Sequence, residues 1–161
     1  MELKRKCELI LDKSIFLSGE FIQGSVYLRL KKPIRARSLK IIFTGTKKVI
    51  IPSSPGSEHL TFIFYKSEIV LGNEKEYYDE SYPIKLEIPL DILEKAKNFG
   101  KGEDVGVGIT AFRTKMAQKE LSMFKSSYPS TDIWCVEASL DIPRRLNLCD
   151  KQEIKILEKQ I

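Results

Sequence analysis

The chain has 161 residues, of which 42% are hydrophobic and 30% charged, and its formal net charge is +5. This length suits one domain with a self-sufficient core, and no apolar run approaches the ~18 residues that a membrane-spanning helix needs. The basic residues near the N-terminus are followed by strand-like alternation rather than by the apolar segment of a secretory leader, so we expect a soluble, cytoplasmic protein.

The first third of the chain predicts a series of half-buried antiparallel strands. Between Glu8 and Lys48, apolar and polar side chains alternate with period 2, which is typical of strands with one face on a core. Turn signals at Ser18-Gly19 and Lys32-Pro33 separate the runs. The side chains expected on the core face are Leu9, Leu11, Val26, Leu28, Leu30, Leu39, Ile41 and Phe43.

Two more strands are predicted in the middle of the chain. The first spans 60–70, and its faces are expected to carry Leu60, Phe62 and Phe64 on one side and Thr61, Ile63 and Tyr65 on the other. The second spans 82–88 and ends at Pro89. Its inward residues are expected to be Tyr82, Ile84, Leu86 and Ile88.

A partly helical insertion is predicted at about 91–130. Asp91 has the character of a helix N-cap for a short helix over 92–98, and Gly100 follows as a stop signal. A longer helix is predicted over 111–125. Its apolar stripe consists of Phe112, Met116, Met123 and Phe124, with Leu121 beside it. The stripe either packs on an outer sheet face or is presented to a partner.

The stretch 132–142 is a further strand, with Trp134, Val136, Ala138 and Leu140 on one face. Together with the earlier motifs it resembles the N-terminal domain of the arrestin family. The residues that carry the resemblance are Gly19-Glu20, Gly24-Ser25-Val26, Lys32-Pro33-Ile34, Leu39 to Gly45, Tyr82 to Pro89, and Trp134 to Ile142 in a Tyr-x-Val-x-Ala-x-Leu-Asp-Ile pattern in which Trp134 replaces the tyrosine. The resemblance covers 8–89 and 132–157.

This resemblance implies an all-β, immunoglobulin-like antiparallel β-sandwich over residues 1–161 that acts as an adaptor or scaffold and does no catalysis. Phosphate-sensing arrestins carry adjacent lysines on the first strand and a buried arginine on the last strand of this domain. Lys4-Arg5-Lys6 falls near the first position, but Lys155 and Glu158 stand near the second, without an arginine. A two-domain arrestin would need a partner chain or a second copy to supply its other half.

No set of residues predicts catalysis, a cofactor or a metal site. His59 is the sole histidine, so no Ser-His-Asp set is available. The cysteines Cys7, Cys135 and Cys149 form no Cys-x-x-Cys pair and are expected to be reduced thiols. The glycines between 100 and 108 do not match a phosphate-binding loop. We therefore expect a binding protein rather than an enzyme.

The charge distribution suggests how a partner would bind. Residues 1–51 hold 12 Lys/Arg against 4 Asp/Glu, whereas the rest holds 15 against 18. We expect a protein partner, acidic or phosphorylated, or a second copy of the chain, to bind at sheet edges and a basic patch. The candidate residues are Lys4, Arg5, Lys6, Arg35, Arg37, Lys47 and Lys48, with Phe112, Met116, Met123 and Phe124.

The alternative is a nucleic acid or a phosphate ligand bound by the same basic third. That function requires aromatic residues interleaved with Lys and Arg, and Tyr27 with Arg29 is the nearest instance. Because no nucleic-acid motif is present, the sequence favours the protein partner.

Overall fold

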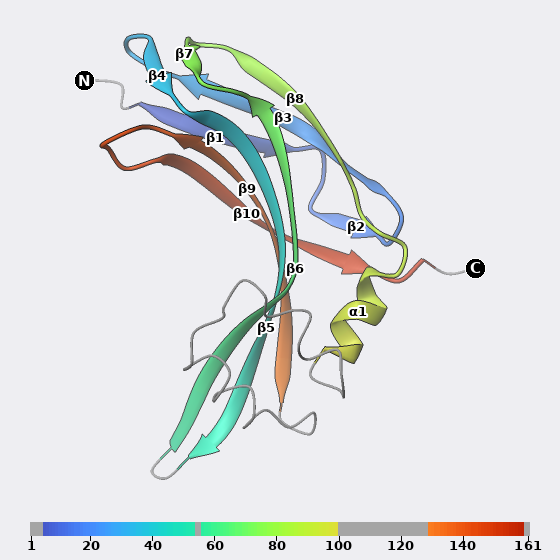
Figure 1. Ribbon diagram of the computed structural model, residues 1–161. Coiled ribbons are helices and arrows are strands. Elements are labelled where there is room, and N and C mark those ends of the chain that lie inside the picture. Colours follow the sequence, from blue (N-terminus) through green and yellow to red (C-terminus); the bar gives the residue numbers. More distant parts are fainter. Residues whose placement is uncertain (1–4, 54–55, 100–128, 160–161) are drawn as a thin grey trace.

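Two β-sheets face each other across a shared core in the computed structural model, which describes residues 5–53, 56–99 and 129–159 (Figure 1). The smaller sheet has the order β1-β3-β8, formed by Lys6–Leu11, Phe21–Arg29 and Ser81–Glu87. The larger has the order β2-β10-β9-β5-β6, formed by Ile15–Leu17, Leu148–Leu157, Ser130–Asp141, Ser38–Ser53 and Gly56–Gly72. A ribbon of β4 (Ile34–Ala36) and β7 (Lys75–Tyr77) lies at one end, and the described helix is α1 (Ile92–Asn98).

The predicted all-β sandwich is confirmed. The strands pair antiparallel except for β2, which runs parallel to β10. Antiparallel sheets with one buried face explain why alternation was so clear in the sequence. The final strand, β10, pairs with β9 over 148–154 and with β2 over 155–157.

The predicted core register is also confirmed. Eight residues expected to share one core belong to a single buried cluster, and none exceeds 6% exposure. They are Leu28, Leu30, Ile41, Phe43, Ile84, Leu86, Trp134 and Val136. Burying each large apolar side chain stabilises the fold by roughly 1.5–3 kcal/mol, so this face supplies much of the driving force for folding.

One predicted alternation is wrong, on β6. Gly45 pairs with Tyr65 while Thr46 pairs with Ile63, so Phe64 is an extra residue in a β-bulge. Such a bulge shifts the phase of the strand by one residue. As a result Phe64 and Tyr65 both pack against the core instead of lying on opposite faces.

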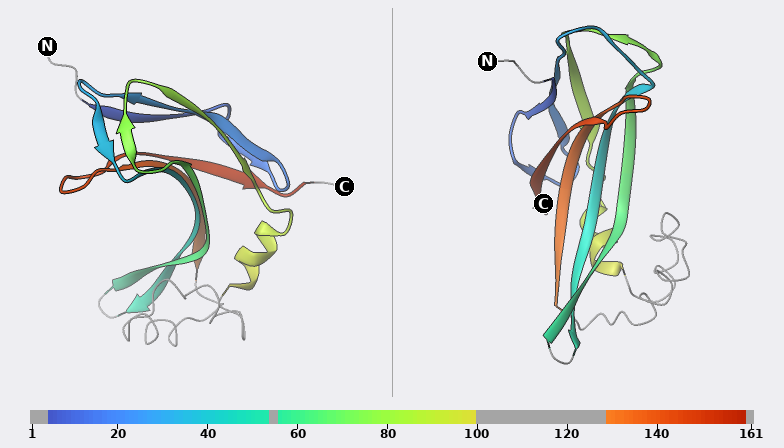
Figure 2. Two further views of the ribbon diagram at one scale, coloured as in Figure 1. Left: turned by 45° about the horizontal axis from the view of Figure 1, so that its top comes forward. Right: turned by 90° about the vertical axis from the view of Figure 1, so that its left-hand side faces the viewer.

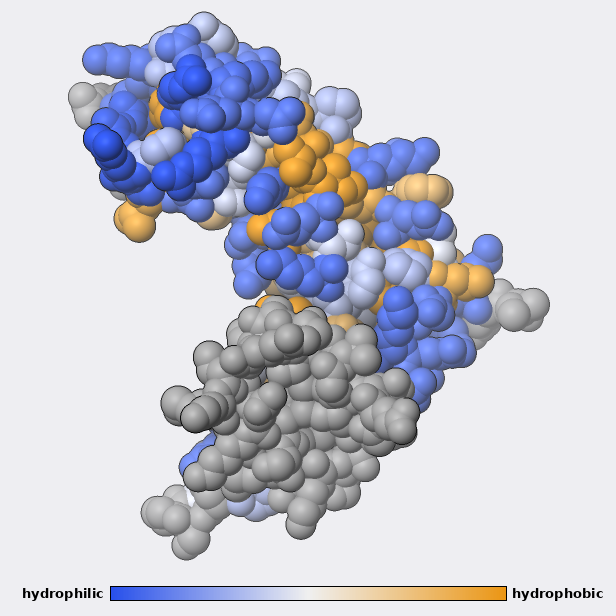
Figure 3. All heavy atoms as spheres, in the orientation of Figure 1, coloured by the Kyte–Doolittle hydropathy of each residue, from blue (hydrophilic) through white to orange (hydrophobic). Residues whose placement is uncertain are grey.

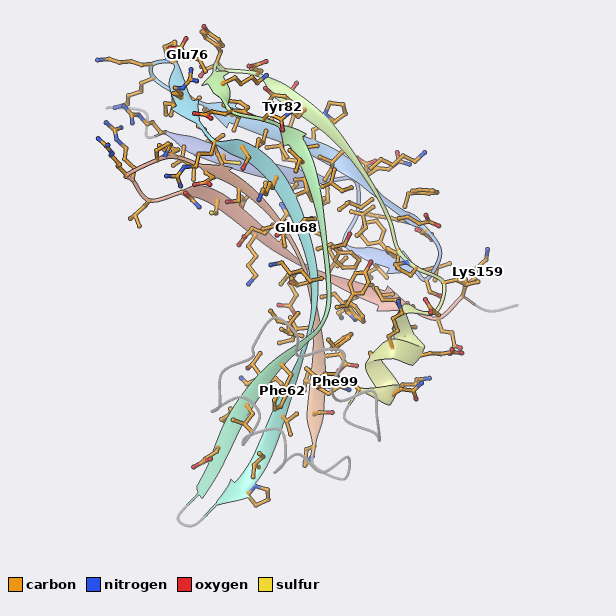
Figure 4. The ribbon with its side chains drawn as sticks, viewed as in Figure 1. Phe62, Glu68, Glu76, Tyr82, Phe99 and Lys159 are labelled. Atoms are coloured by element: carbon orange, nitrogen blue, oxygen red, sulfur yellow. The ribbon has the colours of Figure 1, made fainter. Side chains whose placement is uncertain are left out.

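Beyond the sandwich, β5, β6 and the start of β9 continue as a curved arm (Figures 1 and 2). A second buried cluster lies here, made of Val49, Ile51, Phe62 and Phe99. The Phe99 ring lies 5.8 Å from that of Phe62 and 6.0 Å from that of Phe64, and Figure 4 shows Phe62 and Phe99 side by side. Phe99 directly follows α1, so these ring contacts attach the end of the helix to the arm.

The short helix is confirmed over Ile92–Asn98, with Ile92 and Ala96 buried. Asp91 stands at the predicted N-cap position, although its side chain makes no capping hydrogen bond. The helix predicted over 111–125 lies outside the described residues.

We expect Trp134→Ala to lower the free energy of unfolding by about 3–5 kcal/mol, because Trp134 is 4% exposed and its ring contacts those of Phe43 and Phe64. Chemical denaturation measures the change. The control is Leu146→Ala, at a residue that is 92% exposed, which should change stability by less than about 0.5 kcal/mol. Equal costs for the two variants would contradict the register.

A second prediction concerns the close approach at Gly45. A Cβ atom there would lie 2.5 Å from Cζ3 of Trp134 and 2.9 Å from Cε2 of Phe64. We expect Gly45→Ala to cost about 1–3 kcal/mol through overpacking. This cost should be smaller in a Trp134→Leu background, because the leucine side chain leaves more room for the added methyl group at residue 45. Additive costs in the double-mutant cycle, measured by denaturation, would show that the two residues do not contact each other.

Candidate functional site

Basic side chains from three separate segments meet at one end of the sandwich, which we call the basic end. The end holds the start of β1, the segment from the end of β3 through β4 to β5, and the β9–β10 turn (Figure 1). Lys6 pairs with Arg29 across β1 and β3, and the N–H of Arg37 donates to the carbonyl of Asp141 at 2.7 Å. The basic end consists of Arg5, Lys6, Arg29, Lys31, Lys32, Arg35, Arg37, Arg144 and Arg145.

The structure brings some of the predicted residues together and separates others. Lys6, Arg35 and Arg37 are exposed at the basic end, and Arg5 is partly exposed there. Lys48 is exposed on the arm, eleven residues from Arg37 along β5, which is about 36 Å of extended strand. Five further predicted residues lie outside the described part of the chain: Lys4, Phe112, Met116, Met123 and Phe124.

Lys47 is not available to a partner. It is 7% exposed, its Nζ lies 3.1 Å from Oδ1 of Asp132, and the same nitrogen lies 5.9 Å from the ring centroid of Phe64. A buried ammonium needs an opposite charge because desolvation alone would penalise it. Lys47 therefore forms an internal ion pair of the arm, and we leave it out of the candidate surface.

The β9–β10 turn was missed by sequence reasoning, which included none of its residues in the candidate basic patch. Arg144 adopts φ 61°, in the left-handed region, and the N–H of Ile142 donates to Oδ1 of Asn147 at 3.2 Å across the turn. Arg144 and Arg145 are both exposed. Leu146, which follows them, is 92% exposed. Two arginines followed by a leucine at a hairpin turn were the available signal.

Ion pairs at the basic end are weak and exposed. Lys6 lies 3.3 Å from Glu8, Arg35 lies 3.7 Å from Glu74, and Arg37 lies 3.9 Å from Asp141. Each of these cations has more than half of its side chain accessible. Exposed pairs contribute only ~0–1 kcal/mol, so an acidic ligand can compete for these cations at little cost.

The strand edges differ in how open they are. The edge of β1 is covered at Leu9, whose N–H donates to Oδ2 of Asp150 at 2.7 Å and whose carbonyl accepts from Nε2 of Gln152. The edge strand β8 contains Pro83, which has no N–H to offer. At the edge of the larger sheet, β2 has three residues, whereas β6 has 17 and pairs with no other described strand than β5.

Cys7, Cys135 and Cys149 are free thiols, as the sequence predicts. Burial raises the pKa of the Cys7 thiol to about 12, with smaller contributions from Cys149 and Asp150. Burial also raises the pKa of Cys135. Both thiols therefore stay protonated at neutral pH, whereas Cys149 is exposed.

The described residues offer neither a metal centre nor a membrane-spanning helix. No group of three or more His, Cys, Asp or Glu side chains within this part of the chain could hold a metal ion. None of its helices is long and apolar enough to cross a membrane.

Neither a protein-family model nor a curated protein sequence matches the chain. A solved structure does match: Spo0M, sporulation control protein, from Bacillus subtilis, with a TM-score of 0.58 and 15% sequence identity. The match covers 97% of this chain and 50% of the other, so the chain spans about half the length of Spo0M. At this identity the likeness shows the fold alone. The chain thus has an all-β, arrestin-like fold.

Proposed function

We propose that this chain is a non-catalytic adaptor that captures an acidic or phosphorylated segment of another protein at the basic end. The observation that carries the proposal is the convergence of cations from three segments of the chain on one end of the sandwich. The fold likeness supports a regulatory rather than a catalytic role, because Spo0M is described as a sporulation control protein.

The chemistry of the basic end suits such a ligand. The guanidinium of an arginine presents donors in a planar fork, which matches the two oxygens of a carboxylate or phosphate. Arg144 and Arg145 carry this group on a turn. Leu146 beside them offers an apolar contact, so that the turn combines a charged rim with a hydrophobic anchor.

Opposite charge near this end would orient the ligand. Glu76 and Glu80 are exposed on and just after β7, at the same end of the sandwich as the β9–β10 turn. An acidic ligand is repelled by those carboxylates and attracted by Arg5, Arg144 and Arg145. Electrostatic complementarity of this kind sets the orientation and the rate of association more than the affinity itself.

The test compares two double charge reversals that alter the net charge equally. Arg144→Glu/Arg145→Glu changes the basic end, whereas Lys48→Glu/Lys155→Glu changes exposed lysines on β5 and β10. The wild type and the two variants serve as bait in affinity capture from cells that express this chain. The salt concentration is about 0.15 M, where the Debye length is about 8 Å. Nuclease treatment precedes the capture.

We expect the wild type and the lysine variant to capture the same defined protein, and the arginine variant to recover at least tenfold less of it, since tenfold corresponds to about 1.4 kcal/mol. Equal recovery by the arginine variant would remove the basic end from the proposal. Loss of recovery after nuclease, with direct binding of an oligonucleotide that weakens steeply with salt, would instead support the nucleic-acid alternative.

A further inference from the structure

We propose that two copies of this chain pair edge to edge through β6, antiparallel, with Ser67 of one copy opposite Ser67 of the other. The larger sheets of the two copies then join into one continuous sheet. This interface is separate from the basic end and does not depend on the proposed function.

The outer edge of β6 is suited to strand addition where it borders the sandwich. From Tyr65 to Val70 the strand pairs regularly with β5, between irregularities at Gly45/Thr46 and at Leu39/Lys40. Within the described chain, no strand occupies its other side. An unprotected edge of this kind presents unpaired N–H and C=O groups to another chain. The other edges are less suited: the edge of β1 is covered at Leu9, that of β8 is interrupted by Pro83, and β2 is only three residues long.

The charges on the edge of β6 are complementary to the charges on the same edge of a second, antiparallel copy. Lys66 and Glu68 are exposed on the outer face of the sheet, 3.4 Å apart, and Glu68 also lies 4.0 Å from Lys40. With Ser67 opposite itself, Lys66 faces Glu68 of the second copy and Glu68 faces its Lys66. A register shifted by two residues would place Lys66 opposite Lys66, or Glu68 opposite Glu68. Charge therefore selects one register out of these three.

The inner face gives the same register an apolar contact. Tyr65 of one copy lies opposite Ile69 of the other, and both residues are partly exposed where they pack against the core. An aromatic residue opposite a β-branched one is a favourable cross-strand pair. Leu71, which is partly buried against the same core, continues the apolar surface.

This surface lies at the side of the sandwich where β6 and β8 form the rims of the two sheets. Hydrophobic residues gather there in Figure 3, and Figure 4 shows Tyr82 of β8 near the upper part of β6 above Glu68. α1 contacts β6 further down, where the ammonium of Lys95 lies 5.7 Å from the ring of Tyr65. A second copy would cover the apolar side chains above this helix.

The test uses Lys66→Glu and Glu68→Lys, each of which makes both cross-copy pairs repulsive. Sedimentation velocity over a range of concentrations gives the dimer dissociation constant at about 0.15 M salt. Because each of the two symmetric pairs changes from attraction to repulsion, we expect each variant to raise that constant roughly tenfold. Thermal unfolding checks that the variants fold, as substitutions at exposed positions should allow.

Two further samples restore the complementary charges. In an equimolar mixture of the two variants, one chain is acidic at both positions and the other is basic at both. Each cross-copy pair is then attractive again, so heterodimers should form. The double variant Lys66→Glu/Glu68→Lys should pair with itself about as well as the wild type. A wild type that remains monomeric would overturn the proposal, as would single variants that dimerise like the wild type or a mixture that does not associate.

Discussion

The fold depends on the close packing of Trp134 against Gly45, where the larger sheet leaves the sandwich and becomes the arm. A side chain at residue 45 would occupy the space of the indole ring, so glycine is what lets the tryptophan lie on the strand. Phe64, the extra residue of the adjacent bulge, meets the indole edge-on at 5.1 Å between ring centroids. The bulge also sets the phase of the rest of β6. That phase turns Tyr65 and Ile69 inward and leaves Lys66 and Glu68 on the outer face.

Sequence reasoning succeeded where period 2 was unbroken and failed where a local irregularity or a partner in space decided the outcome. Leu28 and Trp134 were placed correctly because alternation alone fixes the buried face. Tyr65 was placed wrongly because a bulge at Phe64 leaves no trace in a hydrophobic pattern. Lys47 was assigned to a basic patch on charge alone. Lys47 lies an even number of residues from the buried Phe43 and Val49 on the same strand, so the same alternation already indicated an inward position.

The basic end illustrates a different limit. Its cations lie far apart in the sequence, and only the packing of the two sheets against each other brings the start of β1 beside the β9–β10 turn. Counting charges in the first third found Arg5, Lys6, Arg35 and Arg37, but it could not connect them with Arg144 and Arg145. Charge density along a chain predicts a charged surface only when the charged segment folds onto one face, and here β5 carries Lys48 away from that face.

The two proposed surfaces reinforce each other through symmetry. The basic end lies beyond the end of β6 at Gly72, so antiparallel pairing of two copies would direct their basic ends away from each other. A dimer could then engage two acidic segments of one extended partner, or two partner molecules, and the second contact would gain from a raised effective concentration. Association through β1 would offer no such arrangement, because Asp150 and Gln152 already bond the backbone of Leu9. These two side chains therefore do more than join the sheets: they leave β6 as the long described edge at which another strand can add.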